Sequence, residues 1–279
     1  MSIKTVSTII TSQDQMETQL ASATAFARAI DAHLQVLALA VGIDQTGVVQ
    51  SAFDAIPTGI GMEESLRHAR ELAEAATAQM KKEDIRWDVE AFSVPAAVTG
   101  SELVRHLRFS DLVIFQRAPE GAALRQTRML AETVLFDADC PLLMLPETDS
   151  VIAPPTRIMV SWDESSAALR AARQAMPLLQ AARKVEIVLV DPPKDAPDRS
   201  DPGGAFAQFL ARHGIRCEVS VCSRTDSSIA GTLQRHAEEL GSDLIVMGAY
   251  GHSRLRQAIF GGTTRETMEK SRVPVLMAH

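Results

Sequence analysis

An internal duplication is the feature of this sequence that most restricts its possible folds. DLVIF at Asp111–Phe115 leads through a helical stretch to CPLLMLP, and DLIVM at Asp243–Met247 leads through another to VPVLMAH. LVRHL at Leu103–Leu107 and LQRHA at Leu233–Ala237 stand at the same stage of the two segments. A sequence that repeats in this way indicates two copies of one structural unit. The chain of 279 residues is long enough for two domains of ordinary size.

Proline and polar residues separate the two copies. The stretch LPETDSVIAPPT at Leu145–Thr156 contains three prolines and is typical of a linker. We therefore predict a first domain over residues 1–146, a linker over residues 147–156 and a second domain over residues 157–279.

Each copy alternates short β-branched runs with helical stretches long enough for right-handed crossovers. This alternation predicts an α/β fold of two doubly wound, Rossmann-like parallel sheets in tandem. The strands of the second copy are nearly all apolar, so we expect helices on both faces of its sheet. The predicted strands are Thr5–Ile10, Leu34–Val41, Trp87–Ser93, Leu112–Phe115 and Leu142–Leu145, then Arg157–Ser161, Val185–Val190, Cys217–Cys222, Leu244–Met247 and Val275–Ala278.

The helix after the first strand of the second copy has a start signal and a break. Asp163, Glu164 and Ser165 predict an N-terminal cap followed by an acidic first turn. Pro177 is expected to kink or end this helix, because proline lacks the N–H that a helix interior needs.

Composition argues against several classes of function. A net charge of −7 and a pI near 5.5 supply no basic field for nucleic acid or an anionic membrane. No apolar run reaches the roughly 18 residues of a membrane span, and the N-terminus lacks the pattern of a signal peptide. The three cysteines are widely spaced and form no CxxC pair, which argues against a disulfide framework or a zinc site. The cytoplasm is the expected location.

A glycine-rich segment directly follows the fourth strand of the second copy. In an open parallel sheet, ligands bind outside the carboxyl ends of the strands. Gly248 and Gly251 allow the main chain to approach a ligand where a Cβ atom would collide with it. His252, Arg254 and Arg256 lie in the following stretch and can add positive charge, although a solvated loop would also explain them.

A second glycine cluster precedes the last predicted helix. Gly261, Gly262, Thr263 and Thr264 stand immediately before a helix that we expect over Arg265–Ser271. The free N–H groups and positive dipole end of a helix N-terminus bind anions, and the two threonine hydroxyls add donors. The segment therefore predicts a phosphate site.

These glycines also carry a family resemblance. Gly248-x-x-Gly251, nine residues and then Gly261-Gly262-Thr263-Thr264 resembles the G-x-x-G, nine residues, G-S/T signature of nucleotide-binding universal stress proteins. The resemblance covers both copies, because a tandem form of that family has two such domains in one chain. It implies a doubly wound fold and an adenine nucleotide, ATP, which a magnesium ion can accompany on the phosphates.

Matching positions carry the family's binding residues onto this chain. The resemblance implies that Asp163 and Val190 frame the adenine and ribose, with Ser161 and Trp162 beside them. Met247, Gly248 and Gly251 would line the ribose and phosphate side, and His252 and Arg254 would support it. The phosphates would be held by Gly261, Gly262, Thr263 and Thr264.

Two positions depart from the family pattern. Gly262 stands where the family usually has Ser or Thr, which loses one hydroxyl and keeps the main-chain donors. Trp162 stands beside Asp163 where a small residue or Thr is commoner, and it can either stack on the base or crowd it.

The first copy lacks the predicted site. Gln116 and Pro119 occupy the positions of the first two glycines, and Arg128 stands at about the position of Gly261. Ser12 or Gln13 ends the first strand where the second copy has an aspartate. We predict a degenerate partner domain that keeps the fold and pairs with the second domain through the last strand of each.

Catalytic signatures are missing from both copies: GxSxG, HExxH, GxxxxGK[ST] and an SGGxDS-like loop are all absent. Our first hypothesis is a stress-response module that holds ATP as a regulatory or structural ligand. ATP binding would change the conformation of the protein or its association with protein partners or with a second copy in a homodimer. The alternatives are a slow ATP hydrolase of the adenine-nucleotide α-hydrolase-like class and a nucleotide-free interaction scaffold.

Overall fold

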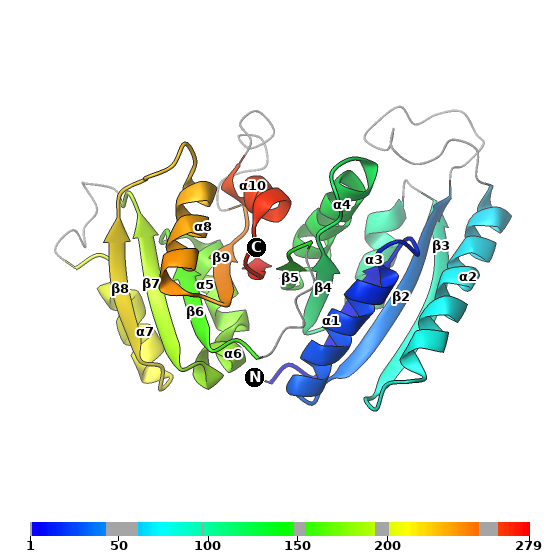
Figure 1. The fold of residues 1–279 in the computed structure, drawn as a ribbon, viewed down its shortest axis with the longest axis horizontal. Coiled ribbons are helices and arrows are strands. Elements are labelled where there is room, and N and C mark those ends of the chain that lie inside the picture. Colours follow the sequence, from blue (N-terminus) through cyan, green and yellow to red (C-terminus); the bar gives the residue numbers. More distant parts are fainter. Residues whose placement is uncertain (1, 43–60, 96–97, 148–153, 193–200, 251–261) are drawn as a thin grey trace. The chain divides into compact units, whose positions relative to one another are not determined.

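A computed structural model describes residues 2–42, 61–95, 98–147, 154–192, 201–250 and 262–279 (Figure 1). The chain divides into two compact units. The first unit contains Ile3–Leu142, and the second contains Leu143–Pro146 and Pro154–His279. Most of the predicted linker, residues 148–153, lies outside the described residues, so the predicted domain boundaries stay a prediction.

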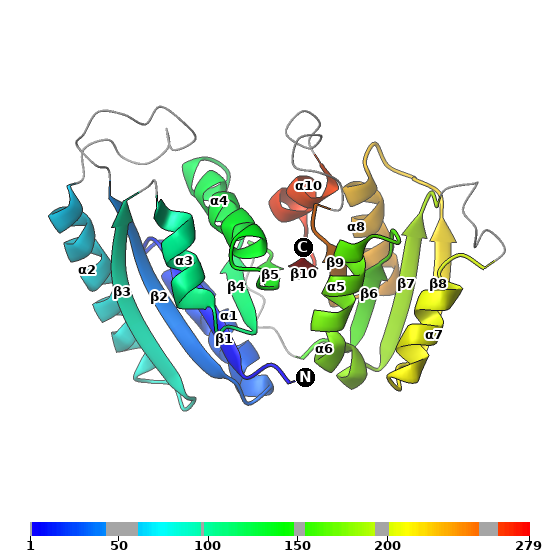
Figure 2. The same cartoon turned by 180° about the vertical axis from the view of Figure 1, so that it is seen from behind.

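The first unit is built on parallel strands. Strand β1 pairs with β2 on one side and with β4 on the other, and β2 pairs with β3. Helices α1 and α2 cover one face of this sheet, and α3 and α4 cover the other (Figures 1 and 2). Its elements are β1 (Thr5–Ile10), α1 (Met16–Ala29), β2 (His33–Gly42), α2 (Met62–Met80), β3 (Trp87–Pro95), α3 (Thr99–Leu107), β4 (Leu112–Gln116) and α4 (Ala122–Phe136). Strand β5 (Leu142–Leu145) follows in the chain, and all but its first residue are assigned to the second unit.

The second unit repeats this layout. Its parallel strands have the order β10-β9-β6-β7-β8. Helices α8 and α10 cover one face, and α5, α6 and α7 cover the other (Figures 1 and 2). Its elements are β6 (Arg157–Ser161), α5 (Ser166–Gln174), α6 (Met176–Ala181), β7 (Lys184–Val190), α7 (Gly204–Arg212), β8 (Cys217–Cys222), α8 (Ile229–Leu240), β9 (Leu244–Gly248), α10 (Thr263–Lys270) and β10 (Val275–Ala278).

One aspartate in each unit ties the start of the first strand to the start of the fourth. Asp111 Oδ2 accepts hydrogen bonds from the N–H groups of Lys4 and Thr5, at 2.7 and 2.9 Å. Asp243 does the same in the second unit: its oxygens accept from the N–H groups of Thr156 and Arg157, at 2.8 and 2.9 Å. The duplication seen in the sequence therefore extends to individual hydrogen bonds.

The predicted strands agree with the observed ones to within two residues at each end. The effect of Pro177 is confirmed: α5 ends at Gln174, and a separate helix begins at Met176 with the proline in its first turn. Helices cover both faces of the second unit's sheet, as predicted, but they cover the strand β8 only in part. This strand stands at the sheet edge, and Val219 and Val221 on it are 40% and 52% exposed.

Cys140 is a core residue between α4 and β5. It is buried, and burial is the main cause that raises the pKa of its thiol to about 12, with Asp111 and Asp139 adding to the effect. Such a thiol stays protonated and unreactive near neutral pH. All three cysteines are free of disulfides.

Among the residues that the structure describes, no helix is both long and apolar enough to cross a membrane.

Candidate functional site

The candidate site lies at the carboxyl edge of the second unit's sheet. Ser161, the last residue of β6, is in register with Val188 on β7 and Met247 on β9. The helices that follow β6 cover one face of the sheet, and α8, which leads into β9, covers the other (Figures 1 and 2). A change of face between adjacent parallel strands is the position at which doubly wound sheets bind ligands. The structure therefore brings the predicted strand ends together at a suitable edge.

Trp162 has an aromatic partner within the protein. Its N–H donates to the carbonyl oxygen of Val188 at 2.9 Å, which continues the β6–β7 ladder by one residue. The indole stacks on Phe206 of α7, with ring centroids 4.0 Å apart and an interplanar angle of 4°. Sequence reasoning missed Phe206, because the contact joins residues that are far apart in the chain. The indole is thus held in place by α7.

The turn from β6 into α5 has a different cap from the predicted one. Ser165 is the N-cap, and its Oγ accepts from the N–H of Ala168 at 3.0 Å. Asp163 lies outside the helix, where its Oδ1 accepts from the N–H of Ser165 at 3.0 Å. Glu164 between them has a φ of +63° and does not belong to an acidic first turn. Asp163 therefore shapes the turn and keeps an exposed carboxylate at the sheet edge.

Asp191, directly after β7, is a residue of this edge that the sequence analysis did not name. Val190 is half-buried and in register with Cys222 of β8. Asp191 follows it with a φ of +45°, and its Oδ1 accepts from the N–H of Arg224 at 3.2 Å. An aspartate between a strand and two prolines is the sequence signal that could have identified this turn.

Gly248 is required by packing inside the unit. A Cβ atom at this position would lie 2.5 Å from the main-chain nitrogen of Ala168 and 2.8 Å from the carbonyl carbon of Ala167. The missing side chain of Gly248 therefore allows the first turn of α5 to approach β9. The preceding residue, Met247, is buried with 5% of its surface exposed.

Helix α10 begins two residues earlier than predicted. Gly262 is its N-cap, with φ and ψ of −75° and 158°, and no side chain caps the helix. Thr263 and Thr264 therefore form the first turn instead of preceding it. The hydroxyl of Thr264 is buried and accepts from the N–H of Tyr250 at 3.1 Å. The main-chain N–H groups of this first turn remain the donors that the site can offer to an anion.

Four predicted site residues, Gly251, His252, Arg254 and Gly261, lie outside the described residues. Their roles stay predictions. The same holds for Arg256, which the sequence analysis counted with them.

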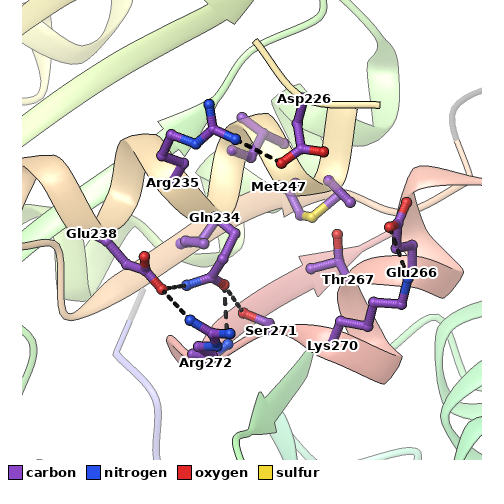
Figure 3. A pocket seen from close by; sticks show the side chains of 14 residues that line it. Asp226, Gln234, Arg235, Glu238, Met247, Glu266, Thr267, Lys270, Ser271 and Arg272 are labelled. Carbon is purple, nitrogen blue, oxygen red and sulfur yellow. Dashed lines mark hydrogen bonds and ion pairs between the residues drawn. The ribbon is translucent and has the colours of Figure 1, made fainter. Parts of the chain in front are cut away.

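A cavity of about 290 Å³ lies beside this edge, between α8 and α10 (Figure 3). Met247 is one of its lining residues and also one of the predicted site residues. Figure 3 shows the charged groups of the cavity paired with one another. The pairs are Asp226 with Arg235 at 2.8 Å, Glu266 with Lys270 at 3.2 Å and Glu238 with Arg272 at 3.6 Å.

Hydrogen bonds hold the carboxylate of Asp226 just before the N-terminus of α8. Hydrogen bonds from the N–H and the hydroxyl of Ser227, together with the neighbouring Arg235, lower the pKa of Asp226 below its usual value. Because the cations of this cavity already have acidic partners, the uncapped first turn of α10 is the better place for a phosphate.

The first unit has a different connection at the corresponding position. Only Arg117–Gly121 separate β4 from α4, whereas residues 249–262 separate β9 from α10. Gln116, at the position of Gly248, is 1% exposed, whereas Pro119 is exposed. Arg128 lies within α4, whereas Gly261, at about the matching position of the second unit, lies outside the described residues.

The fold defines a doubly wound α/β protein, and the geometry of the carboxyl edge in its second unit makes that edge a candidate ligand site. Residues 155–279 match the universal stress protein family. The second unit is therefore a universal stress protein domain.

Solved structures with this fold align with almost the whole chain. A universal stress protein of Archaeoglobus fulgidus superposes with a TM-score of 0.73 at 17% identity, covering 99% of this chain and 96% of that one. A functionally unknown protein of Pseudomonas aeruginosa gives a TM-score of 0.60 at 14% identity, with 99% and 92% covered. At these identities the likeness concerns the fold.

A sequence relative supports the same family. A universal stress protein of Synechocystis is 27% identical over 170 residues, which cover 60% of this chain. The aligned part spans 57% of the length of that relative.

Proposed function

We propose that the second unit binds one adenine nucleotide, ATP, as a regulatory or structural ligand in a stress response. The observation that carries this proposal is the uncapped N-terminus of α10 beside the carboxyl edge of β6 and β9. In the same unit, Ser165 and Ser228 cap the first turns of α5 and α8, whereas α6 and α7 have no side-chain cap. The first turn of α10 has no such side chain, so its N–H groups can bind phosphate oxygens.

The strand ends supply the other half of the proposed site. Asp163 presents an exposed carboxylate at the end of β6, and Val190 is half-buried at the end of β7. A carboxylate suits the hydroxyls of a ribose, and a half-buried apolar residue suits the face of a base. Trp162 is held against Phe206, so we propose that it supports the wall of the base site through α7.

Residues that fit a nucleotide do not by themselves hydrolyse it. Among the described residues, no group of three His, Cys, Asp or Glu side chains could hold a metal ion. We propose that a magnesium ion, where present, accompanies the phosphates and that the bound ATP stays intact. Phosphoryl transfer depends on positioned metal ions and charged groups.

The binding test uses a charge at the first position of α10. Thr263→Glu places a carboxylate at the helix N-terminus, where it favours the helix and repels a phosphate. We expect ATP affinity, measured by calorimetry, to fall by at least about tenfold, or ~1.4 kcal/mol. Ala122→Glu is the matched control, because Ala122 is the exposed first residue of α4 in the first unit.

Three results would contradict the proposal. The unchanged protein could fail to bind ATP, which would favour a nucleotide-free scaffold. Two equivalent sites per chain would show that the first unit also binds. Chromatography of the nucleotide after hours of incubation reports hydrolysis, and steady release of ADP would favour the slow hydrolase instead.

A further inference from the structure

The main chain that leaves β9 is held by three hydrogen bonds. The N–H of Ala249 donates to the carbonyl oxygen of Ala278 at 2.7 Å. The carbonyl oxygen of Ala249 lies 3.0 Å from Nδ1 of His279. The N–H of Tyr250 donates to Oγ1 of Thr264 at 3.1 Å. Both polar groups of Ala249 and the donor of Tyr250 are therefore satisfied.

The chemistry of the His279 contact determines which atom carries the proton. A carbonyl oxygen only accepts hydrogen bonds, so Nδ1 of His279 must be the donor. The neutral Nδ1–H tautomer and the imidazolium both meet this requirement. Tyr250 follows directly with a φ of +55°, a conformation that residues other than glycine rarely adopt. The hydrogen bonds of Ala249 and of the Tyr250 N–H hold the main chain that leads into this conformation.

The imidazole itself is well placed by its own main chain. Ala278 is in register with Gly248, which brings the end of β10 beside the end of β9. Arg170 of α5 donates to the main-chain carbonyl oxygen of His279. This contact does not involve the imidazole, so a change of the side chain leaves the main-chain anchor in place.

We propose that His279 is a positioning residue for the nucleotide. By holding the Ala249 carbonyl, it fixes the Gly248–Tyr250 main chain that borders the candidate site. The inference rests on the proposed function and adds a residue that lies outside the glycine motif. His279 acts through the main chain and does not itself touch the ligand.

Two substitutions separate the donor from the ring. His279→Asn keeps an N–H donor close to the position of Nδ1, whereas His279→Phe keeps an aromatic ring and removes the donor. The ATP dissociation constant is measured by calorimetry, and thermal melting of the ligand-free protein is measured alongside. We expect the Phe variant to bind ATP about fivefold more weakly, as for the loss of one hydrogen bond, and the Asn variant to bind within about twofold of the parent.

The outcomes distinguish this inference from the proposed function. If the parent protein does not bind ATP, both fail. If the parent binds ATP and the Phe variant binds equally well, or if Asn and Phe weaken binding equally, the positioning role fails and the nucleotide site stands. His279→Gln is the second variant should the Phe variant not fold. It moves the donor away from Nδ1 and is expected to bind more weakly than Asn, and equal binding would overturn the inference.

Discussion

The two units share one strand arrangement and differ in how many residues lie between the fourth strand and the next helix that the structure describes. In the first unit five residues, Arg117–Gly121, lead directly into the long helix α4. In the second unit, residues 249–262 intervene, and α10 is a helix of eight residues. The aspartates that tie the strands together are the same in both. The fold therefore does not depend on this connection, which leaves it available for a ligand site in the second unit.

A single position shows how the difference is built. Gln116 ends β4 with a buried side chain, and Gly248 ends β9 with no room for one. At Gly248 the main chain of Ala167 and Ala168 occupies the space that a side chain would need. The second unit thus brings a helix N-terminus closer to its sheet edge than a side chain at this position would allow.

The largest expected effect comes from closing that approach. Gly248→Val should lower the free energy of unfolding by about 3 kcal/mol, because main-chain atoms of α5 would have to move. Urea denaturation followed by circular dichroism measures it. Gly61→Val is the control, since a Cβ atom there meets nothing within 4 Å, and it should cost about 1 kcal/mol or less. Equal losses for the two variants would show that the close approach of α5 has no energetic weight.

The shared aspartates should matter in both units. Asp111→Ala and Asp243→Ala each remove an acceptor of two main-chain N–H groups and should each cost about 1.5 kcal/mol, with a somewhat larger loss for Asp243, which also accepts from the Thr156 hydroxyl. Scanning calorimetry measures both variants. ATP affinity should stay unchanged in both, because these residues lie at the opposite end of the strands from the candidate site. A loss in one variant alone would break the structural equivalence of the units.

The smallest effect concerns the caps of α4 and α10. Gly262→Ser should raise stability by about 0.3 kcal/mol, because the extended conformation of Gly262 suits a serine N-cap. Gly121→Ser, at the N-cap of α4, should instead cost about 1 kcal/mol, since its φ of +119° suits only glycine. Thermal melting of both variants tests the difference. Two changes of the same sign would contradict it.

The strands and the duplication could be predicted because they depend on local patterns. Apolar runs such as Leu142–Leu145 and Val275–Ala278 have one stable arrangement in a covered parallel sheet, and their bounds agree with the structure. The exposure of β8 could not be predicted. Its sequence alternates polar residues with Val219 and Val221, a pattern that predicts buried valines, and only the strand order shows that it stands at an edge.

The details of the candidate site depend on main-chain conformations and on contacts between residues far apart in the chain, and neither can be read from the sequence. Asp163, Glu164 and Ser165 could each have capped α5, and only the left-handed conformation of Glu164 assigns the role to Ser165. The start of α10 was misplaced because threonines are also common just outside helices. The partners of Trp162 and His279, namely Phe206 and Ala249, lie far from them in the chain.

The stacking of Trp162 on Phe206 has a spectroscopic consequence. The chain contains two tryptophans, Trp162 in the second unit and Trp87 in the first. Each unit thus carries one tryptophan as an intrinsic fluorophore. Trp162 lies next to the candidate site and stacks on Phe206, with the two ring centroids 4.0 Å apart. Removing either tryptophan leaves an emission signal that reports on a single unit. The two halves of the duplication can therefore be observed separately in the intact chain.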